Sequence, residues 1–268
     1  MWGAAPWAFS AASFRGATAV TSMRWVADCS STEIAGALIE RDEVRVVGLY
    51  LESINDTAGL MRLAERSAAL QKPVVMLLAG KTVSGWQAAV SHTGAMVQPG
   101  ESFLTWARMV GFVVVDDLVA LHDTSLTLLA NRRSVGRKIV AVTTSGGAGS
   151  LIADHVEAAG LVLADVPASL RRELLKVIPD FGSIDNPIDV TAQLFRDGTM
   201  HTFSDLVSTI ANEPEFDQVI VAVTSLGGEL GVEFADAVAK IDTGAPVHVC
   251  WLAGRDFSAG GRAVMRDH

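Results

Sequence analysis

The order of apolar segments is the feature that most limits the fold of this chain. Short runs rich in Val, Ile and Leu alternate with longer segments in which apolar residues recur every three or four positions. Uninterrupted apolar runs indicate strands buried on both faces, as in a parallel sheet between layers of helices. The sequence therefore predicts an α/β fold of three layers with mainly parallel sheets. The expected strands are 44–51, 73–79, 112–115, 138–143, 218–224 and 247–252. The expected helices are 31–41, 58–70, 102–110, 118–131, 148–159, 169–177, 202–212 and 229–240, and 264–268 also has a helical pattern.

A polar stretch near the middle divides this pattern into two parts. Residues 131–137 contain three arginines, a Ser and a Gly between an expected helix and an expected strand. We therefore expect two flavodoxin-like domains, residues 1–133 and 134–268, each of a size typical for one domain. The chain opens with small and aromatic residues, without an apolar strand and Gly-rich turn. We expect the first domain to lack its opening strand.

Composition excludes several classes of function. The formal net charge is -9 and no run of clustered Lys and Arg is present, which argues against a nucleic-acid surface. No apolar stretch approaches the ~20 residues of a membrane helix, and residues 1–13 lack the basic and continuous apolar regions of a signal peptide. Cys29 and Cys250 lie far apart and outside any metal-ligand spacing. We expect a cytoplasmic protein without a disulfide or a metal site.

The segment after the strand expected at 73–79 carries the first candidate for chemistry. Residues 81–95 read KTVSGWQAAVSHTGA, and small or hydroxylic residues, Ser91, Thr93 and Gly94 among them, surround His92. Such neighbours predict an accessible loop histidine that could act as a nucleophile or contact a phosphate. The alternative is an imidazole that only caps or fills a loop.

Glu52 is a candidate partner for this histidine. It stands at the carboxyl end of the strand expected at 44–51, the edge at which open α/β sheets bind ligands. A carboxylate bonded to one imidazole nitrogen fixes the tautomer and leaves the other nitrogen free to attack. An exposed glutamate without such a role is the alternative.

A glycine-rich turn between an expected strand and an expected helix is the second candidate. Residues 143–149 read TTSGGAG, and unpaired N–H groups at a helix start favour a bound anion. The candidate phosphate-binding residues are Ser145, Gly146, Gly147, Ala148 and Gly149. The turn lacks the spacing of a Walker or dinucleotide-binding loop, and a purely structural tight turn is the alternative.

A proline-containing turn at 184–190, IDNPIDV, offers Asn186 and Asp189 as further candidates. Proline fixes the backbone, and Asn or Asp side chains bond to nearby backbone groups in such turns. A structural loop explains the same residues equally well.

Taken together, these motifs resemble those of the ADP-forming acyl-CoA synthetases, relatives of succinyl-CoA ligase and ATP-citrate lyase. The resemblance covers nearly the whole chain in the same order, through YLE, KPVVMLLAGKT, SHTGA, TTSGGAG and NPIDV. It implies that His92 carries a phosphoryl group and that Glu52 stabilises it. It also implies that two helix N-termini are aimed at the phosphohistidine, the second of which matches residues 145–149. The family's first anion-binding turn has no intact counterpart here, and residues 23–28 depart from its usual Gly-Asn pattern.

The resemblance also implies the reaction and the partners. Acyl-CoA, ADP and phosphate would be converted reversibly to a carboxylic acid, CoA and ATP, with Mg accompanying the nucleotide and no covalently bound cofactor. The CoA-binding Rossmann domain and the ATP-grasp domain of the family have no match in this sequence. We therefore expect an incomplete catalytic unit, from a truncated gene or a fragment, that assembles with these domains as a homo- or hetero-oligomer.

Two other functions fit the same fold. One is a regulatory synthetase-like module of a protein lysine acetyltransferase, and the other is a non-catalytic interaction scaffold. The presence of both His92 and Glu52 favours the ligase. The sequence does not indicate which carboxylic acid would be the substrate.

Overall fold

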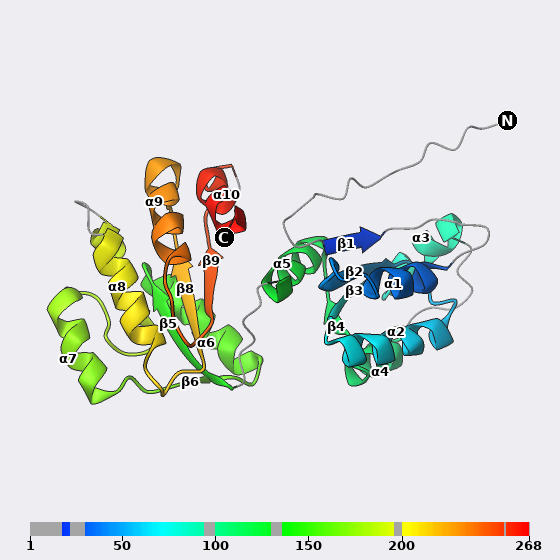
Figure 1. The fold of residues 1–268 in the computed structure, drawn as a ribbon, viewed down its shortest axis with the longest axis horizontal. Helices are drawn as coiled ribbons and strands as arrows, with labels where there is room; N and C mark the ends of the chain where they lie inside the picture. The colour runs from blue at the N-terminus through cyan, green and yellow to red at the C-terminus, as the bar shows by residue number, and fades with distance from the viewer. Residues whose placement is uncertain are drawn as a thin grey trace. The chain divides into compact units, whose positions relative to one another are not determined.

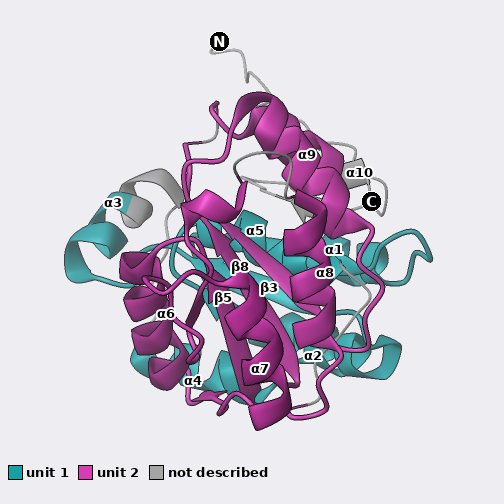
Figure 2. Cartoon of the chain, turned by 90° about the vertical axis from the view of Figure 1, so that its left-hand side faces the viewer, with its two compact units in different colours: residues 1–131 teal, residues 132–268 magenta. Residues whose placement is uncertain are grey.

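The structure is a computed structural model that describes residues 18–21, 30–93, 100–129, 136–195, 200–254 and 256–267 (Figure 1). The chain divides into two compact units, residues 1–131 and 132–268 (Figure 2). The sequence placed its domain boundary between residues 133 and 134. None of the helices among the described residues has both the length and the apolar character needed to cross a membrane.

Unit 1 is built on a parallel sheet with the strand order β1-β2-β3-β4 in its described part. Its strands are β1 (Thr18–Thr21), β2 (Val46–Leu51), β3 (Val74–Leu78) and β4 (Val113–Val115). Its helices are α1 (Ser31–Ile39), α2 (Thr57–Leu70), α3 (Val83–Thr93), α4 (Glu101–Met109) and α5 (Leu118–Leu129).

Successive residues of β2 and β3 point to opposite faces of this sheet, and both faces are covered. One face packs against α1, α2 and α4, and the other packs against α5. The residues of β2 and β3 on the first face are Val47, Leu49, Leu51, Val74, Met76 and Leu78. Those on the second face are Val46, Tyr50, Val75 and Leu77. Because both faces are buried, β3 is apolar throughout, as the sequence predicted.

Unit 2 contains a second parallel sheet, ordered β6-β5-β8-β9, with β7 paired to β5. Its strands are β5 (Lys138–Thr143), β6 (Val162–Leu163), β7 (Ile188–Asp189), β8 (Gln218–Val223) and β9 (Val247–Trp251). Its helices are α6 (Gly146–Ala158), α7 (Ala168–Val177), α8 (Met200–Ala211), α9 (Gly228–Ala239) and α10 (Ala259–Asp267), with a 3₁₀ helix η1 (Ala192–Phe195). Figure 2 shows α6 on one side of β5 and α8 on the other.

The core of unit 2 is centred on aromatic rings between the sheet and α8 and α9. Phe234 of α9 lies 5.6 Å from Phe203 of α8 and 5.2 Å from Trp251 of β9, measured between ring centroids. Phe195 of η1 completes the group at 5.0 Å from Phe203. These separations suit tilted and edge-to-face contacts between aromatic rings.

The α/β class with parallel sheets and three layers is confirmed, and most differences concern short elements. The sequence did not predict β1, β6, β7 or η1, the longest of which spans four residues. Runs of this length carry too little apolar pattern to be recognised. The expectation that the first domain lacks its opening strand concerns residues before Thr18, which lie outside the described part of the chain.

The helix α3 is a larger difference, because the sequence predicted a loop there. Thr82 caps the helix, since its Oγ1 accepts a hydrogen bond of 3.1 Å from the N–H of Gly85. Small and hydroxylic residues between 84 and 93 had suggested irregular structure. The capping threonine, followed by apolar residues at helical spacing, was the signal that this interpretation missed.

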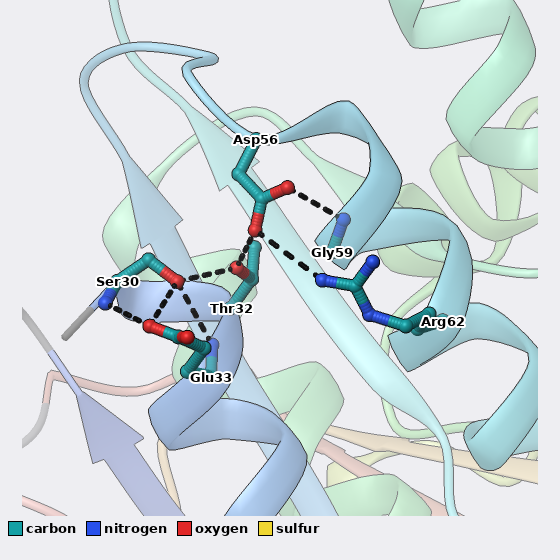
Figure 3. A network of polar contacts seen from close by, with 6 residues as sticks. All are labelled: Ser30, Thr32, Glu33, Asp56, Gly59 and Arg62. Carbon is teal, nitrogen blue, oxygen red and sulfur yellow. Dashed lines mark hydrogen bonds and ion pairs between the residues drawn. The ribbon is translucent and has the colours of Figure 1, made fainter.

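A network of polar contacts joins the first turns of α1 and α2 (Figure 3). Asp56 caps α2, accepting hydrogen bonds from the N–H of Gly59 at 2.7 Å and from the hydroxyl of Thr32 in α1 at 2.6 Å. Ser30 caps α1 in a capping box with Glu33. We call Thr32, Asp56 and Gly59 the helix clamp.

The helix clamp requires a glycine at position 59. A Cβ atom there would lie 1.9 Å from Asp56 Oδ2 and 2.5 Å from the hydroxyl oxygen of Thr32. Both distances are far below van der Waals contact. The clamp therefore holds two helices that begin at the carboxyl edge of the unit 1 sheet.

Candidate functional site

The carboxyl edge of the unit 1 sheet brings together polar residues from three turns. Glu52 follows β2, Lys81 follows β3, and Asp116 and Asp117 follow β4. The strands are parallel, so their carboxyl ends meet at the same edge. Glu52 lies where the sequence placed it.

Tyr50 is the side chain that contacts Glu52. Its hydroxyl donates to Glu52 Oε1 across 3.4 Å, and both residues are partly buried. Burial raises the pKa of Tyr50, and the negative charge of Glu52 and the hydrogen bond to it act in the same direction. Tyr50 was not predicted as a site residue, although residues two apart along an extended backbone point to the same side.

A cleft of about 660 Å³ opens at this edge between the turn after β3 and the turn after β4. Its lining includes Tyr50, Lys81, Asp116 and the exposed Leu118. Lys81 Nζ lies 2.6 Å from Asp116 Oδ1. Hydrogen bonding to Lys81, followed by its positive charge, holds the pKa of Asp116 below its ordinary value.

The structure places the backbone of Ser91, His92 and Thr93 in the last turn of α3. The expectation of a loop at these three residues is therefore wrong. The structure does not describe their side chains, and Gly94 lies outside the described residues. The contact between the imidazole of His92 and Glu52 stays a prediction.

In unit 2, the turn after β5 leads directly into α6, as the sequence predicted. Ser145 is the N-cap residue in extended conformation, and its side chain makes no capping bond. Thr143 Oγ1 instead accepts from the N–H of Ser145 and donates to its carbonyl oxygen, each at 3.1 Å. Within the described part of unit 2, no acceptor is bonded to the N–H groups of Gly146, Gly147 or Ala148.

The glycines of this turn have different surroundings. A Cβ atom at Gly147 would meet only Ser145 Oγ, at 3.9 Å, whereas one at Gly149 would lie 3.3 Å from Pro187. A Cβ atom at Gly146 would lie 3.4 Å from Asp189 Oδ2. The carboxylate of Asp189 thus lies beside the start of α6, where the helix dipole favours a negative charge.

The two candidate residues of the 184–190 turn, Asn186 and Asp189, form hydrogen bonds with the backbone. The side-chain amide of Asn186 donates to the carbonyl oxygens of Ile139 and Ala164 and accepts from the N–H of Ala141, all within 3.0 Å. Asp189 Oδ1 accepts from the N–H of Thr191 at 2.9 Å. The bonds of Asn186 support a structural role, one of the two alternatives that the sequence left open.

A second turn lies at the carboxyl edge of the unit 2 sheet, and the sequence did not predict it as a candidate site. It follows β8, and Ser225 and Gly228 both have positive φ, 55° and 57°. The hydroxyl oxygens of Thr144 and Thr224 lie 3.3 Å apart, and the N–H of Thr224 donates to Thr144 Oγ1 at 3.2 Å. These bonds tie the turn before α6 to the turn before α9. The letters TSLGGEL, which repeat the pattern of TTSGGAG after an apolar strand, were the available signal.

Comparison with known proteins shows which family models and relatives this chain matches. A family model described as succinyl-CoA ligase like flavodoxin domain matches residues 8–128, and one described as Ligase-CoA domain matches residues 139–222. The chain is 26% identical over 238 residues to subunit alpha of acetate–CoA ligase [ADP-forming] II from Pyrococcus furiosus, covering 85% of this chain and 50% of that one. It is 31% identical over 187 residues to acetate–CoA ligase [ADP-forming] I from Archaeoglobus fulgidus, covering 70% of this chain and 26% of that one.

Among solved structures, the fold matches the dinucleotide forming acetyl-coenzyme A synthetase 1 of Ca. Korarchaeum cryptofilum in complex with phosphate and ADP. The TM-score is 0.70 at 22% sequence identity, and the match covers 88% of this chain and 51% of that one. The likeness shows that the fold is shared. The chain spans about half or less of the length of these relatives.

Proposed function

The chain belongs to the family of ADP-forming acyl-CoA synthetases, and we propose that it supplies the phosphohistidine part of such an acid–thiol ligase. The family resemblance that the motifs predicted is confirmed by these matches. The observation that carries the proposal is the placement of Glu52 at the carboxyl edge of the sheet that also leads into α3, the helix of His92. We propose that this carboxylate and the imidazole of His92 act on the same ligand.

The proposed reaction has three displacements. A phosphate oxygen attacks the thioester carbonyl, the C–S bond breaks, and CoA leaves as an acyl phosphate forms. An imidazole nitrogen of His92 then attacks phosphorus, and the carboxylic acid leaves as its carboxylate. An oxygen of the ADP β-phosphate attacks the phosphohistidine, the P–N bond breaks, and ATP forms. A covalent intermediate divides one difficult transfer into easier ones.

In this proposal Glu52 orients the imidazole. Its carboxylate accepts a hydrogen bond from one ring nitrogen, so the other nitrogen carries the lone pair that attacks phosphorus. The same carboxylate stabilises the positive charge that the ring acquires in the transfer. Ser91, Thr93 and Gly94 flank the histidine, and we propose that they let a phosphate approach it.

We further propose that the start of α6 is a phosphate-binding site of unit 2. The N–H groups of Gly146, Gly147 and Ala148 have no bonded acceptor in the described part of this unit, and Ser145 and Gly149 complete the turn. Such groups and the helix dipole together favour an anion. Asp189 would weaken the binding of an anion at this site, because its negative carboxylate lies beside Gly146.

The complete activity requires more than this chain in our proposal. The chain spans about half or less of its relatives, so we propose that a CoA-binding Rossmann domain and an ATP-grasp domain or subunit act with it. The nucleotide, with Mg, would bind to the ATP-grasp part, and acyl-CoA to the CoA-binding part. We propose that the assembled enzyme acts in the cytoplasm.

The test is whether His92 accepts a phosphoryl group. The full chain is incubated with ³²P-labelled acetyl phosphate, and separately with labelled ATP and an ATP-grasp subunit of the family. We expect label that is lost in acid and stable in base, as for phosphohistidine. Replacing His92 with alanine should abolish the label, whereas His122→Ala, at a surface histidine of α5, should retain it. Label that persists in the His92→Ala variant, or a wild-type chain that takes up none, contradicts the proposal, and the second result favours the scaffold.

The contribution of Glu52 gives a second prediction. Glu52→Gln keeps the size of the side chain but removes its charge, so the imidazole loses its orienting and stabilising partner. We expect the labelling rate to fall by about 100-fold or more, in the range of general acid–base effects. Glu101→Gln, at an exposed glutamate of α4, is the matched control and should label at the wild-type rate. Equal rates for all three chains would remove Glu52 from the mechanism.

A further inference from the structure

We infer that Tyr50 is a positioning residue whose hydroxyl holds the carboxylate of Glu52 in the orientation that the phosphoryl transfer requires. The inference rests on the proposed function of Glu52. It gives a role to the tyrosine of the YLE motif, for which the motif alone implied none.

The position of Tyr50 is fixed by the sheet and by the core. Tyr50 lies in β2 and pairs with Leu77 of β3. Its ring is packed against the apolar cluster that β2, β3, β4 and α5 form, and the residue also lines the cleft at the carboxyl edge. The hydroxyl is therefore presented at the sheet edge by a partly buried ring that packs against this cluster.

Glu52 is not held by strand pairing and core packing in this way. It follows the last residue of β2, so its side chain leaves the sheet from a turn. Among the described residues, the hydroxyl of Tyr50 lies 3.4 Å from Glu52 Oε1. This distance is longer than the roughly 2.5–3.0 Å of an ordinary O–H···O bond, so the strength of the contact has to be measured by titration.

The proposed role follows from how a carboxylate accepts hydrogen bonds. An ionised carboxylate has two oxygens and can accept at both. A tyrosine hydroxyl at Oε1 fixes the rotamer and leaves Oε2 for the ring N–H of His92. When the carboxylate of Glu52 is held in one orientation, the imidazole is misaligned less often. Misalignment of a reacting group lowers the rate of the reaction.

The electrostatic surroundings of Tyr50 make the contact measurable. The charged groups that line its cleft are Lys81, Asp116 and Asp117, and Glu52 is its hydrogen-bond partner. Burial is the main cause of its raised pKa, and the charge of Glu52 is the next. Removing that charge should therefore lower the pKa of Tyr50 toward its ordinary value, while the part due to burial remains.

Tyr50 is the only tyrosine in the sequence, so its ionisation can be followed without interference. Tyrosinate absorbance is measured against pH in the full chain, with far-ultraviolet circular dichroism as a check that the fold persists. The wild type is compared with Glu52→Gln and with Asp116→Asn, which removes a carboxylate on the other side of the cleft. We expect a clear fall in the pKa of Tyr50 for Glu52→Gln and a smaller change for Asp116→Asn. Equal pKa values in the wild type and Glu52→Gln would show that the contact does not exist, and the inference would fail.

The role in catalysis is tested with Tyr50→Phe and Tyr50→Leu. Phenylalanine removes only the hydroxyl, whereas leucine also removes part of the packing. We expect the phosphorylation of His92 by acetyl phosphate to slow by roughly 10-fold in Tyr50→Phe, the effect of losing one hydrogen bond to a charged group. The thermal midpoint should stay close to that of the wild type.

The outcomes separate this inference from the proposed function. If the wild type is not phosphorylated, the proposed function fails and the positioning role fails with it. If the wild type and Tyr50→Phe are phosphorylated at the same rate, the proposed function stands and the positioning role is overturned. If only Tyr50→Leu is slow, Tyr50 contributes packing alone.

Discussion

The glycines of the turn before α6 differ in whether they can be replaced by a residue with a Cβ atom. Gly147 has open space around its Cα, whereas Gly149 is enclosed by Pro187 and by the buried Thr143. Both glycines lie in the first turn of the helix. The sequence TTSGGAG does not distinguish them, because the enclosure of Gly149 depends in part on Pro187, which lies outside this motif.

We predict stability changes of opposite sign for alanine at these two glycines. Gly147→Ala should stabilise unit 2 by up to about 1 kcal/mol, because alanine favours the helical backbone. Gly149→Ala should destabilise it, since overpacking against a proline ring and a strand residue costs about 1–3 kcal/mol and exceeds the same helical gain. Chemical denaturation followed by circular dichroism measures both. A stabilised Gly149→Ala variant would mean that Pro187 moves aside at little cost.

The candidate site was predictable where it depended on position along the chain. Glu52 at a strand end and Ser145 at a helix start follow from apolar runs and their flanking residues. Tyr50 was missed because its role depends on a contact at the sheet edge. The loop predicted at His92 is a helical turn because the cap at Thr82 and the apolar spacing outweigh the small residues.

At the scale of elements, the helix clamp connects two helices that are adjacent in space. Thr32 of α1 is buried and donates to Asp56, which caps α2. This hydrogen bond, followed by the one from Gly59, lowers the pKa of Asp56 below its ordinary value of 3.8. Asp56 is partly exposed, so the effect is screened by solvent.

We predict that Thr32→Val destabilises unit 1 by about 1 kcal/mol, because it removes a hydrogen bond to a charged group at a partly exposed site. Thr57→Val makes the same chemical change at the exposed first residue of α2 and should have little effect. Urea denaturation at neutral pH compares the two. Equal losses in both variants would remove the clamp as a source of stability.

The clamp also predicts a pH dependence. A carboxyl group whose pKa is lowered by folding contributes stability above its unfolded pKa and loses it as the pH falls through the folded pKa. The contribution of Asp56 should therefore be complete above about pH 4 and should disappear at more acidic pH. In Thr32→Val the main cause of the lowered pKa is absent, so the loss of stability on acidification should be smaller. Denaturation midpoints measured between pH 5 and acidic pH decide this.

Long apolar elements were predicted well and short ones were not. The expected strand at 138–143 coincides with β5, and that at 73–79 differs from β3 by one residue at each end. Two-residue strands such as β6 and β7 form because β5 offers them free backbone groups, which a local pattern does not reveal. Pairing of this kind is a tertiary property.

At the scale of the whole molecule, each unit has its own core. The clusters of unit 1 contain no residue of unit 2, and the cluster around Phe234 contains no residue of unit 1. The polar stretch at residues 131–137 had predicted two domains. The separate cores predict that the units lose stability independently.

Phe234→Ala tests this independence. Phe234 is fully buried, so we expect unit 2 to lose about 3–5 kcal/mol. Hydrogen exchange followed by mass spectrometry should show faster exchange in peptides of β5 and β8 and unchanged exchange in peptides of β2 and β3. Leu63→Ala, at a buried residue of α2, should give the reverse pattern. Faster exchange in both units from either variant would show that they unfold together.

The side chain of Asn186 completes the backbone bonding of unit 2, and its neighbour preserves it chemically. Asparagine deamidates spontaneously when the backbone nitrogen of the next residue attacks the side-chain carbonyl carbon. The next residue here is Pro187, whose nitrogen carries no hydrogen, so this ring closure is blocked. Conversion to aspartate would replace an amide that donates to Ile139 and Ala164 with oxygens that repel those carbonyls. The sheet of unit 2 therefore depends on a residue that the chain itself protects from the commonest spontaneous damage to asparagine.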